Sequence, residues 1–311
     1  MSKTTILCLT SIMTIGALAM PAPGDAQGGG RLRERMKQRM EERQRENPAP
    51  PAQTFAYGGD PLQKVDFWKA DAPGPDTPLV IFVHGGGWKR GDKDGATGAT
   101  KISHYRQQGY AFASVNYRLV PEARVEDEAQ DVADAIAYLV KRAGTLGFDP
   151  HKVVLMGHSA GAHLSALVGT DMRYLQKAGL RPDALRGVIP LDGAAYDVPR
   201  QISDGGNFMH DTYVQAFGSD PARQRALSPT FQAGKPNAPA FLILHVQRED
   251  GAAQSEALGA ALRKAGTAAD VKGFEGRGLR GHMEINRNLG DPNYPATPVV
   301  DAWLKQVFAG G

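Results

Sequence analysis

Cysteine is almost missing from this chain of 311 residues, in which Cys8 is the only one. Cys8 lies in an apolar run near the start of the chain and lacks the small-residue setting of a lipoprotein site. One cysteine forms no internal disulfide and supplies no pair of thiols for redox chemistry. Because 41% of the residues are hydrophobic, we expect a buried core, rather than covalent bonds, to stabilise the fold.

A hydrophobic run long enough to cross a bilayer is also missing, since a spanning helix needs about 20 apolar residues. The shorter run from Ile6 to Met20 follows Lys3 and precedes Pro and Gly residues, which is typical of a secretory signal. Cleavage is expected after Ala19 or after Ala26. Residues 1–26 are therefore predicted to be a signal peptide, and the mature protein to be periplasmic or secreted with no membrane span. An uncleaved anchor is the alternative.

An excess of charge of one sign is confined to a single segment. Residues 31–46 carry seven Arg or Lys against four Glu, which accounts for the whole formal charge of +3. No aromatic residue interrupts this segment, so its composition argues against a nucleic-acid-binding domain. Together with the Pro-rich stretch ENPAPPAQ, it predicts a charged and Pro-rich N-terminal segment over 27–53. A solvated helix or tether is favoured there over a helix that binds a membrane or a partner.

Signatures of metal and cofactor sites are lacking as well. His158 and His163 are not at the spacing of an HExxH zinc motif, and no cluster of carboxylates joins them. The glycine-containing stretch GWKRGDK lacks the Gly-Lys-Ser/Thr of a phosphate-binding loop. The sequence therefore predicts neither a bound metal nor a cofactor.

Continuous apolar runs recur along the rest of the chain, at 79–83, 111–116, 153–156, 188–191 and 241–245. Runs of this kind predict strands that are buried on both faces of a sheet. Amphipathic stretches alternate with them, such as the one in which Val132, Ile136 and Val140 fall at helical spacing. The predicted fold class is α/β, a doubly wound and mostly parallel sheet with helices on both faces. It occupies residues 54–311, with a cap insertion at about 194–234.

Two glycine-rich motifs follow two of the predicted strands. GHSAG, residues 157–161, is either an ordinary tight turn or a nucleophile elbow that lifts Ser159 clear of the backbone at a helix N-terminus. HGGGW, residues 84–88, ends the strand LVIFV and would let backbone N–H groups approach an oxyanion without interference from side chains. The two motifs together favour a hydrolase that uses Ser159 as its nucleophile.

At these residues the sequence resembles the α/β-hydrolase fold, and within it the hormone-sensitive-lipase-like and feruloyl-esterase-like carboxylesterases. The motifs that carry the resemblance are HGGGW, GDK, SVNYRL, GHSAG and GHMEIN, and it covers nearly everything from Tyr57 to Val307. The resemblance implies that Ser159 is the nucleophile and that the backbone of Gly86, Gly87 and Ala160 forms the oxyanion hole. HGGGW also satisfies the HGGxW pattern of kynurenine formamidases.

The other members of a catalytic triad are expected beyond the elbow, in the order serine, acid, histidine. His282 is the histidine that follows every plausible acid, whereas His210 lies in the cap and His245 ends a strand. Three carboxylates are candidates for the acid. Asp250 is preferred because the family segment HVxRxD matches HVQREDGAAQS, and Glu249 and Asp192 are the alternatives.

These features predict an exported serine carboxylesterase that cleaves small or medium acyl esters or aryl esters through an acyl-enzyme. The alternatives are an arylformamidase or amidase of the same fold and a non-catalytic relative that binds a partner through its cap. Trp88, Phe208 and Tyr213 are the candidate substrate-binding residues, since aromatic faces favour flat ligands. A role of such residues in the cap's own core is the alternative. The expected partner is a small-molecule ester, and the sequence gives no oligomeric state.

Overall fold

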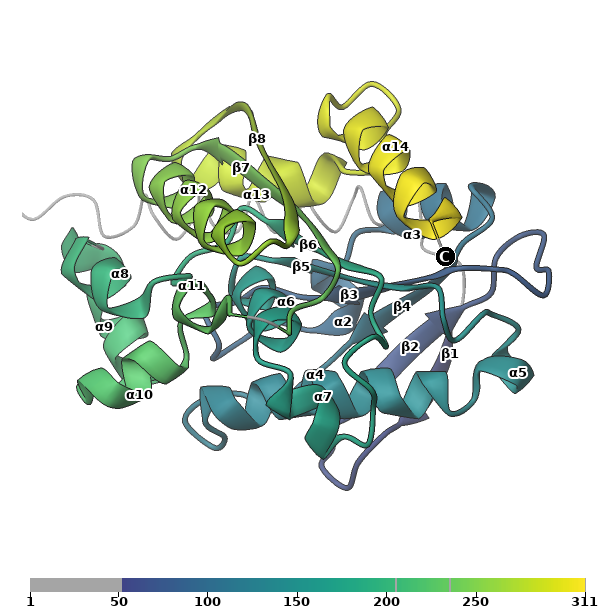
Figure 1. The fold of residues 1–311 in the computed structure, drawn as a ribbon, viewed down its shortest axis with the longest axis horizontal. Helices are drawn as coiled ribbons and strands as arrows, with labels where there is room; N and C mark the ends of the chain where they lie inside the picture. Colours follow the sequence, from purple (N-terminus) through teal and green to yellow (C-terminus); the bar gives the residue numbers. More distant parts are fainter. Residues whose placement is uncertain (1–51, 205, 235, 311) are drawn as a thin grey trace, which may run out of the picture. The chain divides into compact units, whose positions relative to one another are not determined.

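The protein is described from a computed structural model, which covers residues 52–204, 206–234 and 236–310. The predicted signal peptide and nearly all of the charged segment lie outside these residues. An eight-stranded sheet in the order β1-β2-β4-β3-β5-β6-β7-β8 forms the centre of the described part (Figure 1). The pairs β1–β2 and β2–β4 are antiparallel, and the other neighbouring pairs are parallel. The predicted mostly parallel sheet is confirmed.

Each of the five apolar runs that predicted buried strands lies in a strand, except that the run 111–116 extends one residue beyond β4. The bounds of the strands are β1 Gln53–Ala56, β2 Lys64–Trp68, β3 Leu79–Val83, β4 Ala111–Val115, β5 Val153–His158, β6 Gly187–Leu191, β7 Ala240–Gln247 and β8 Ala268–Arg277. Every residue of β3, β4, β5 and β6 is buried, because helices cover both faces of the sheet.

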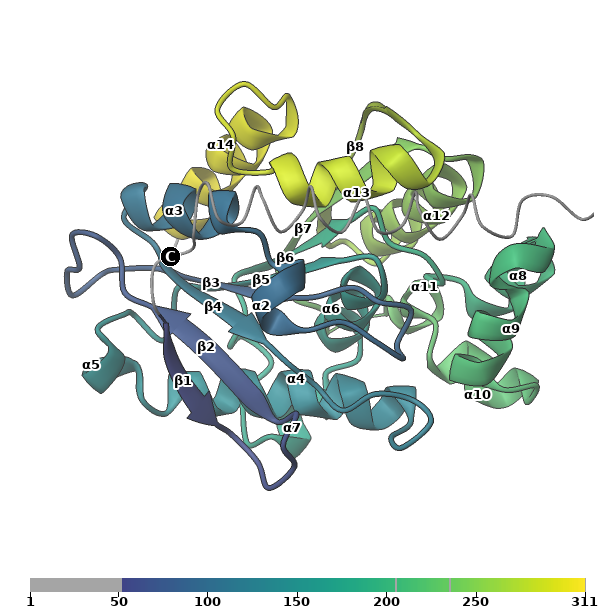
Figure 2. The same cartoon turned by 180° about the vertical axis from the view of Figure 1, so that it is seen from behind.

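Helices follow most of the strands, and Figure 2 shows them from behind. Their bounds are α2 Lys93–Ala96, α3 Ala99–Gln107, α4 Val125–Val140, α5 Ala143–Leu146, α6 Ala160–Thr170, α7 Arg173–Lys177, α8 Val198–Asp204, α9 Gly206–Phe217, α10 Pro221–Ala226, α11 Pro229–Gln232, α12 Glu249–Lys264, α13 Gly278–Asn288 and α14 Ala296–Ala309. The predicted amphipathic helix is α4, whose Val132 and Ile136 are fully buried. Acidic residues in the first turn of α4 stabilise the helix by interacting with the positive end of its dipole.

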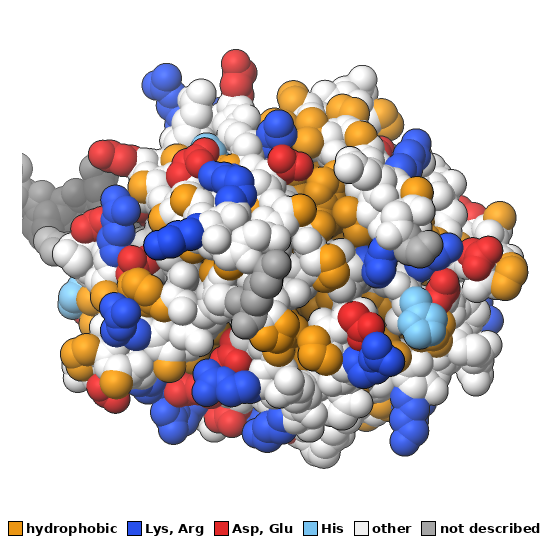
Figure 3. Space-filling view, in the orientation of Figure 1, with side chains coloured by type: hydrophobic (Ala, Val, Ile, Leu, Met, Phe, Trp, Pro, Cys, Tyr) orange, Lys and Arg blue, Asp and Glu red, His pale blue; other side chains and the backbone are white. Residues whose placement is uncertain are grey.

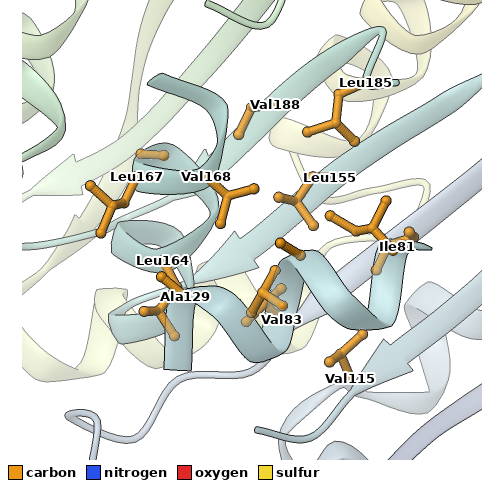
Figure 4. Packing of buried hydrophobic residues seen from close by; sticks show 14 of the residues in the cluster. Ile81, Val83, Val115, Ala129, Leu155, Leu164, Leu167, Val168, Leu185 and Val188 are labelled. Atoms are coloured by element: carbon orange, nitrogen blue, oxygen red, sulfur yellow. The ribbon is translucent and has the colours of Figure 1, made fainter. Parts of the chain in front are cut away.

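Two apolar cores lie on opposite faces of the sheet, because alternate residues of a strand point to opposite sides. Ile81 and Val83 of β3 belong to a core that also contains side chains of α4 and α6 (Figure 4). Phe82, between them, belongs to the second core with side chains of α3, α13 and α14. On the surface shown in Figure 3, side chains of both signs lie interspersed. None of the helices in the described ranges has the length and apolar character that a bilayer crossing requires.

The long connection between β6 and β7, which was expected to form a cap, contains the helices α8 to α11. It lies beyond the ends of the parallel strands toward which their arrows point (Figure 1). A Cβ atom placed on Gly87 would lie 3.1 Å from Cγ2 of Thr212 on α9. The connection therefore packs directly against the HGGGW turn, at the edge of the sheet where both glycine-rich motifs meet.

Candidate active site

Ser159 has the backbone conformation of a nucleophile elbow. It joins β5 to α6 with φ 57° and ψ −119°, a strained region for a residue other than glycine. The flanking glycines make the turn possible, because a Cβ atom on Gly157 would lie 2.2 Å from the Gly161 carbonyl oxygen. A Cβ atom on Gly161 would in turn lie 2.2 Å from the carbonyl oxygen of Val83. Strand, turn and helix therefore pass at distances that only glycine allows, with Ser159 at the apex.

His282, in the first half of α13, reaches the serine. Its Nε2 lies 3.0 Å from the Ser159 hydroxyl, and its Nδ1 lies 2.6 Å from Oδ2 of Asp192. In the neutral imidazole, Nδ1–H donates to the carboxylate and Nε2 accepts from the serine hydroxyl. The three side chains form a continuous hydrogen-bonded series of nucleophile, base and acid, which is the arrangement needed to move a proton off the serine.

Asp192 is completely buried and follows β6 with φ 42°. Its own N–H donates to the Leu244 carbonyl at 2.7 Å, and Oδ1 accepts from the backbone N–H of Val246 at 3.0 Å. Burial by itself would raise the pKa of the Asp192 carboxyl, but the hydrogen bond from His282 and the charge of Arg248 lower it below its ordinary value. The carboxylate is therefore held ionised against the imidazole.

The preferred acid, Asp250, was the wrong choice, since the carboxylate that contacts His282 belongs to Asp192. Asp250 lies in the first turn of α12, and its Oδ2 accepts a hydrogen bond from Gln201 of α8 at 3.2 Å. The neighbouring Glu249 is exposed. The physical reason is sheet order, because β6 lies next to the nucleophile strand β5. A carboxylate at the end of β6 meets the imidazole directly, whereas α12 directs Asp250 toward α8.

The HGGGW turn lies against the elbow. A Cβ atom on Gly85 would be 2.9 Å from Cβ of Ser159, and one on Gly86 would be 1.8 Å from the carbonyl oxygen of Arg90. Gly86 and Gly87 both have positive φ, at 142° and 62°. Among the described residues, no acceptor is found for the N–H groups of these two glycines. The two glycines follow Gly85, the residue of the turn that lies against Ser159, and α6 begins at the third expected donor, Ala160. The oxyanion hole expected from these three amides stays a prediction.

Comparison with known proteins adds family information to this geometry. Residues 65–182 match the family described as BD-FAE. Esterase LipC of Mycobacterium tuberculosis is 31% identical over 202 residues, which is 62% of this chain and 50% of the relative. A probable isoprenylcysteine alpha-carbonyl methylesterase of Oryza sativa subsp. japonica is 36% identical over 114 residues, 37% of this chain and 27% of that protein. The chain thus spans at most about half the length of these relatives.

Solved structures extend the similarity to about nine tenths of the chain. Esterase B from Lactobacillus Rhamnosis (HN001) matches with a TM-score of 0.71 at 21% identity, covering 91% of this chain and 93% of the other. The chain has the α/β-hydrolase fold. A hyperthermophilic esterase from Pyrobaculum calidifontis matches with a TM-score of 0.69 at 19% identity, covering 90% and 93% of the two chains. The resemblance of the chain to the hormone-sensitive-lipase and feruloyl-esterase type of this fold is confirmed.

Two buried histidines, His158 and His163, contact residues of the site and of the HGGGW turn. His158 donates from Nε2 to the backbone carbonyl of His282 at 2.8 Å, and burial lowers its pKa well below the ordinary value. Trp88 donates from Nε1 to Nδ1 of His163 at 3.3 Å, and His163 donates from Nε2 to the carbonyl of Leu227 at 2.8 Å. The sequence gave no sign of these partners.

Trp88 of the HGGGW turn and the aromatic residues of the cap are packed against one another. Trp88 and Tyr213 are 1% and 4% exposed, and the Trp88 ring lies 6.0 Å from that of Tyr213 and 4.8 Å from that of Phe217. These contacts fit the alternative that the aromatic residues form the cap's own core. The side chain of Phe208 lies outside the described part. In the described ranges, no group of three or more His, Cys, Asp or Glu side chains could hold a metal ion.

Proposed function

We propose that this α/β-hydrolase is a serine esterase that cleaves carboxylic esters through an acyl-enzyme. The observation that carries the proposal is the hydrogen-bonded series Ser159–His282–Asp192 beside the glycine turn. The relatives named as esterases support ester hydrolysis as the activity. Retention of the nucleophile, the base and the glycine turn together argues against a module that only binds a partner, because binding needs none of them.

The reaction uses the groups in the order in which they contact one another. Ser159 Oγ attacks the ester carbonyl while His282 Nε2 takes its proton, and Asp192 stabilises the imidazolium that forms. The amides of Gly86, Gly87 and Ala160 stabilise the oxyanion. His282 then gives the proton to the leaving alcohol. A water molecule, activated by the same imidazole, opens the acyl-enzyme, and no step requires a metal or a cofactor.

The proposed substrates are esters with a small or medium acyl group or an aryl group. Contact between α9 and the oxyanion turn supports a limited acyl site, because Thr212 lies close to Gly87. Trp88 and Tyr213 stay candidate binding residues because they lie where the HGGGW turn meets α9. The apolar run after Lys3 supports export to the periplasm or the medium, and export argues against a formamidase that acts on a cytoplasmic metabolite.

The function is tested by comparing kcat/KM on short aryl esters, a feruloyl ester, a long-chain ester and N-formylkynurenine. We expect the short aryl or feruloyl esters to be the best substrates and Ser159→Ala to reduce their turnover by at least about 10³. A preference of about tenfold for the formamide, equivalent to about 1.4 kcal/mol, would replace the esterase with an amidase. Equal turnover by Ser159→Ala would contradict the mechanism.

A further inference from the structure

Arg248 lies beside Asp192, the acid of the series. It precedes α12 as its N-cap residue, directly after β7. Its Nε is 3.1 Å from Oδ2 of Asp192, and its Nη2 donates to the backbone carbonyl of Gly193 at 3.2 Å. The Arg248 side chain is 17% exposed and that of Asp192 is 0% exposed, so this ion pair is shielded from solvent far more than a surface pair.

The chain leaves specific room for the guanidinium. A Cβ atom on Gly251, one turn into α12, would lie 2.9 Å from Nη2 of Arg248 and 3.4 Å from Oδ1 of Asp192. Arg248 thus contacts both the carboxylate and the carbonyl of the next residue, Gly193, around a backbone turn with positive φ at Asp192. Two contacts on one strained turn fix the direction in which Asp192 presents its carboxylate.

One carboxylate oxygen contacts both the His282 imidazole and the Arg248 guanidinium. Oδ2 of Asp192 meets Nδ1 of His282 at 2.6 Å and Nε of Arg248 at 3.1 Å, while Oδ1 accepts from a neutral backbone N–H. During catalysis His282 becomes an imidazolium, which the negative charge of Asp192 stabilises. The fixed positive charge of Arg248 opposes that stabilisation, because like charges at short range repel.

Other titratable groups lie around the Asp192–His282 pair: His158, Tyr196, Glu284, Tyr294 and Lys101. Burial raises the pKa of both tyrosines and lowers that of His158, so these three are neutral near pH 7. Glu284 is paired with Arg280 at 2.7 Å. Burial lowers the pKa of Lys101 to about 7, and its Nζ donates to the backbone of α13 at Asn286. Among the described residues, Arg248 is therefore the permanent cation that contacts Asp192.

We propose that Arg248 is a positioning residue that sets the pH range of the reaction: it orients and ionises Asp192, and it limits how strongly Asp192 favours the protonated form of His282. With Arg248 present, the imidazole gives up its proton more easily, and the enzyme keeps its active, neutral histidine to lower pH. This inference rests on the proposed esterase function and concerns the same site.

The test is the pH profile of kcat/KM on a neutral aryl ester for the wild type, Arg248→Gln and Arg248→Lys. We expect the acid limb of Arg248→Gln to move to higher pH by about half to one unit, the size expected for one partly screened charge at contact distance. Arg248→Lys keeps the charge and should leave the limb near its wild-type position. Arg118→Gln is the matched control, because Arg118 forms a comparable ion pair, 2.7 Å from buried Asp131, outside the catalytic series. The acid limb of the Arg118→Gln profile should not move.

Gly251→Ala provides a second variant that keeps the arginine and displaces the guanidinium. We expect a smaller shift in the same direction, with the fold retained because alanine favours a helix. The low-field proton resonance of His282 Nδ1–H, followed against pH, reports the same titration without turnover. Unshifted limbs and an unshifted resonance in both Arg248→Gln and Gly251→Ala would overturn the inference. Failure of the proposed function would look different, since the wild type itself would then lack serine-dependent esterase activity.

Discussion

Replacing Asp192 by asparagine should separate the two candidate acids, because the surroundings of the carboxylate leave no suitable orientation for an amide. Oδ1 of Asp192 accepts from the N–H of Val246 at 3.0 Å, and Oδ2 accepts from Nδ1 of His282 at 2.6 Å. Either orientation of the asparagine amide points its NH₂ group at one of these donors. With the NH₂ toward the imidazole, His282 is driven to the tautomer that carries its proton on Nε2 and cannot accept from Ser159.

The expected loss in turnover is therefore large. The same substitution in the best-studied serine triad lowers kcat by about 10⁴, which corresponds to about 5.5 kcal/mol at about 1.4 kcal/mol per tenfold change. Asp192→Asn also leaves Arg248 without its buried partner, and we expect a loss of about 1–3 kcal/mol in the free energy of unfolding. The protein should nevertheless fold at 25 °C, since globular domains of this kind are stable by about 5–15 kcal/mol.

Asp250→Asn is the matched variant. Asp250 is only half-buried and accepts one hydrogen bond, from Gln201 at 3.2 Å, and an asparagine oxygen can accept the same bond. We expect kcat within about threefold of the wild type and little change in stability. The assay is kcat and KM on an aryl ester with both variants normalised to folded protein by circular dichroism. A loss of orders of magnitude in Asp250→Asn, with Asp192→Asn close to the wild type, would refute the assignment drawn from the geometry.

Three further outcomes are expected. Trp88→Phe removes the donor to His163, and kcat should fall by about tenfold with little change in KM if this bond positions the oxyanion turn; an unchanged kcat would contradict that role. Burial lowers the pKa of His163 to about 4. The stability that neutral His163 contributes is therefore full above the ordinary pKa near 6.5, and roughly 3 kcal/mol of it is lost as the pH falls toward 4. The melting temperatures of the wild type and His163→Gln should converge between pH 7 and 4.5. Export predicts processing between Ala19 and Gln27, and an intact N-terminus in soluble cytoplasmic protein, seen by mass spectrometry, would contradict it.

The sheet was predictable from sequence because its signal is carried by consecutive residues. The run LVIFV at 79–83, for example, forms β3 and is buried throughout. A strand that is covered on both faces has no solvent-exposed side that would require polar residues. The sequence signals of the elbow and of the glycine turn were also carried by consecutive residues. Gly157, Gly161 and Gly86 lie where a Cβ atom would overlap backbone atoms. Only glycine fits such positions, so the sequence itself indicates them.

The acid of the series was not predictable in the same way, because it depends on which strand end faces the imidazole. Asp192 and Asp250 both follow buried strands, and the sequence pattern favoured the second. Sheet order decides between them, and no pattern of consecutive residues states that β6 lies next to β5. The partners of the buried histidines were hidden for the same reason, as His158 contacts a residue 124 positions away.

The roles of Trp88 and of the cap's aromatic residues depend on side-chain packing, which composition does not determine. Trp88 and Tyr213 carry the features of binding residues, and in the structure they are buried against each other and against Phe217. An aromatic side chain suits a pocket wall and a small core equally well. Kinetic comparison of Tyr213→Leu with the wild type across aryl and alkyl esters would distinguish the two, since a wall residue changes the ratio of the two rates.

The central claim is that Ser159 is an activated nucleophile, and covalent labelling tests it most directly. Folded wild-type protein is treated with a fluorophosphonate, and the modified peptide is identified by mass spectrometry, with Ser159→Ala and His282→Gln as controls. The hydrogen bond of 3.0 Å between Ser159 and His282 predicts stoichiometric labelling of Ser159 in the wild type, none in Ser159→Ala, and labelling slower by orders of magnitude in His282→Gln. An unmodified Ser159 in folded wild-type protein, or equal labelling rates with and without His282, would contradict the account.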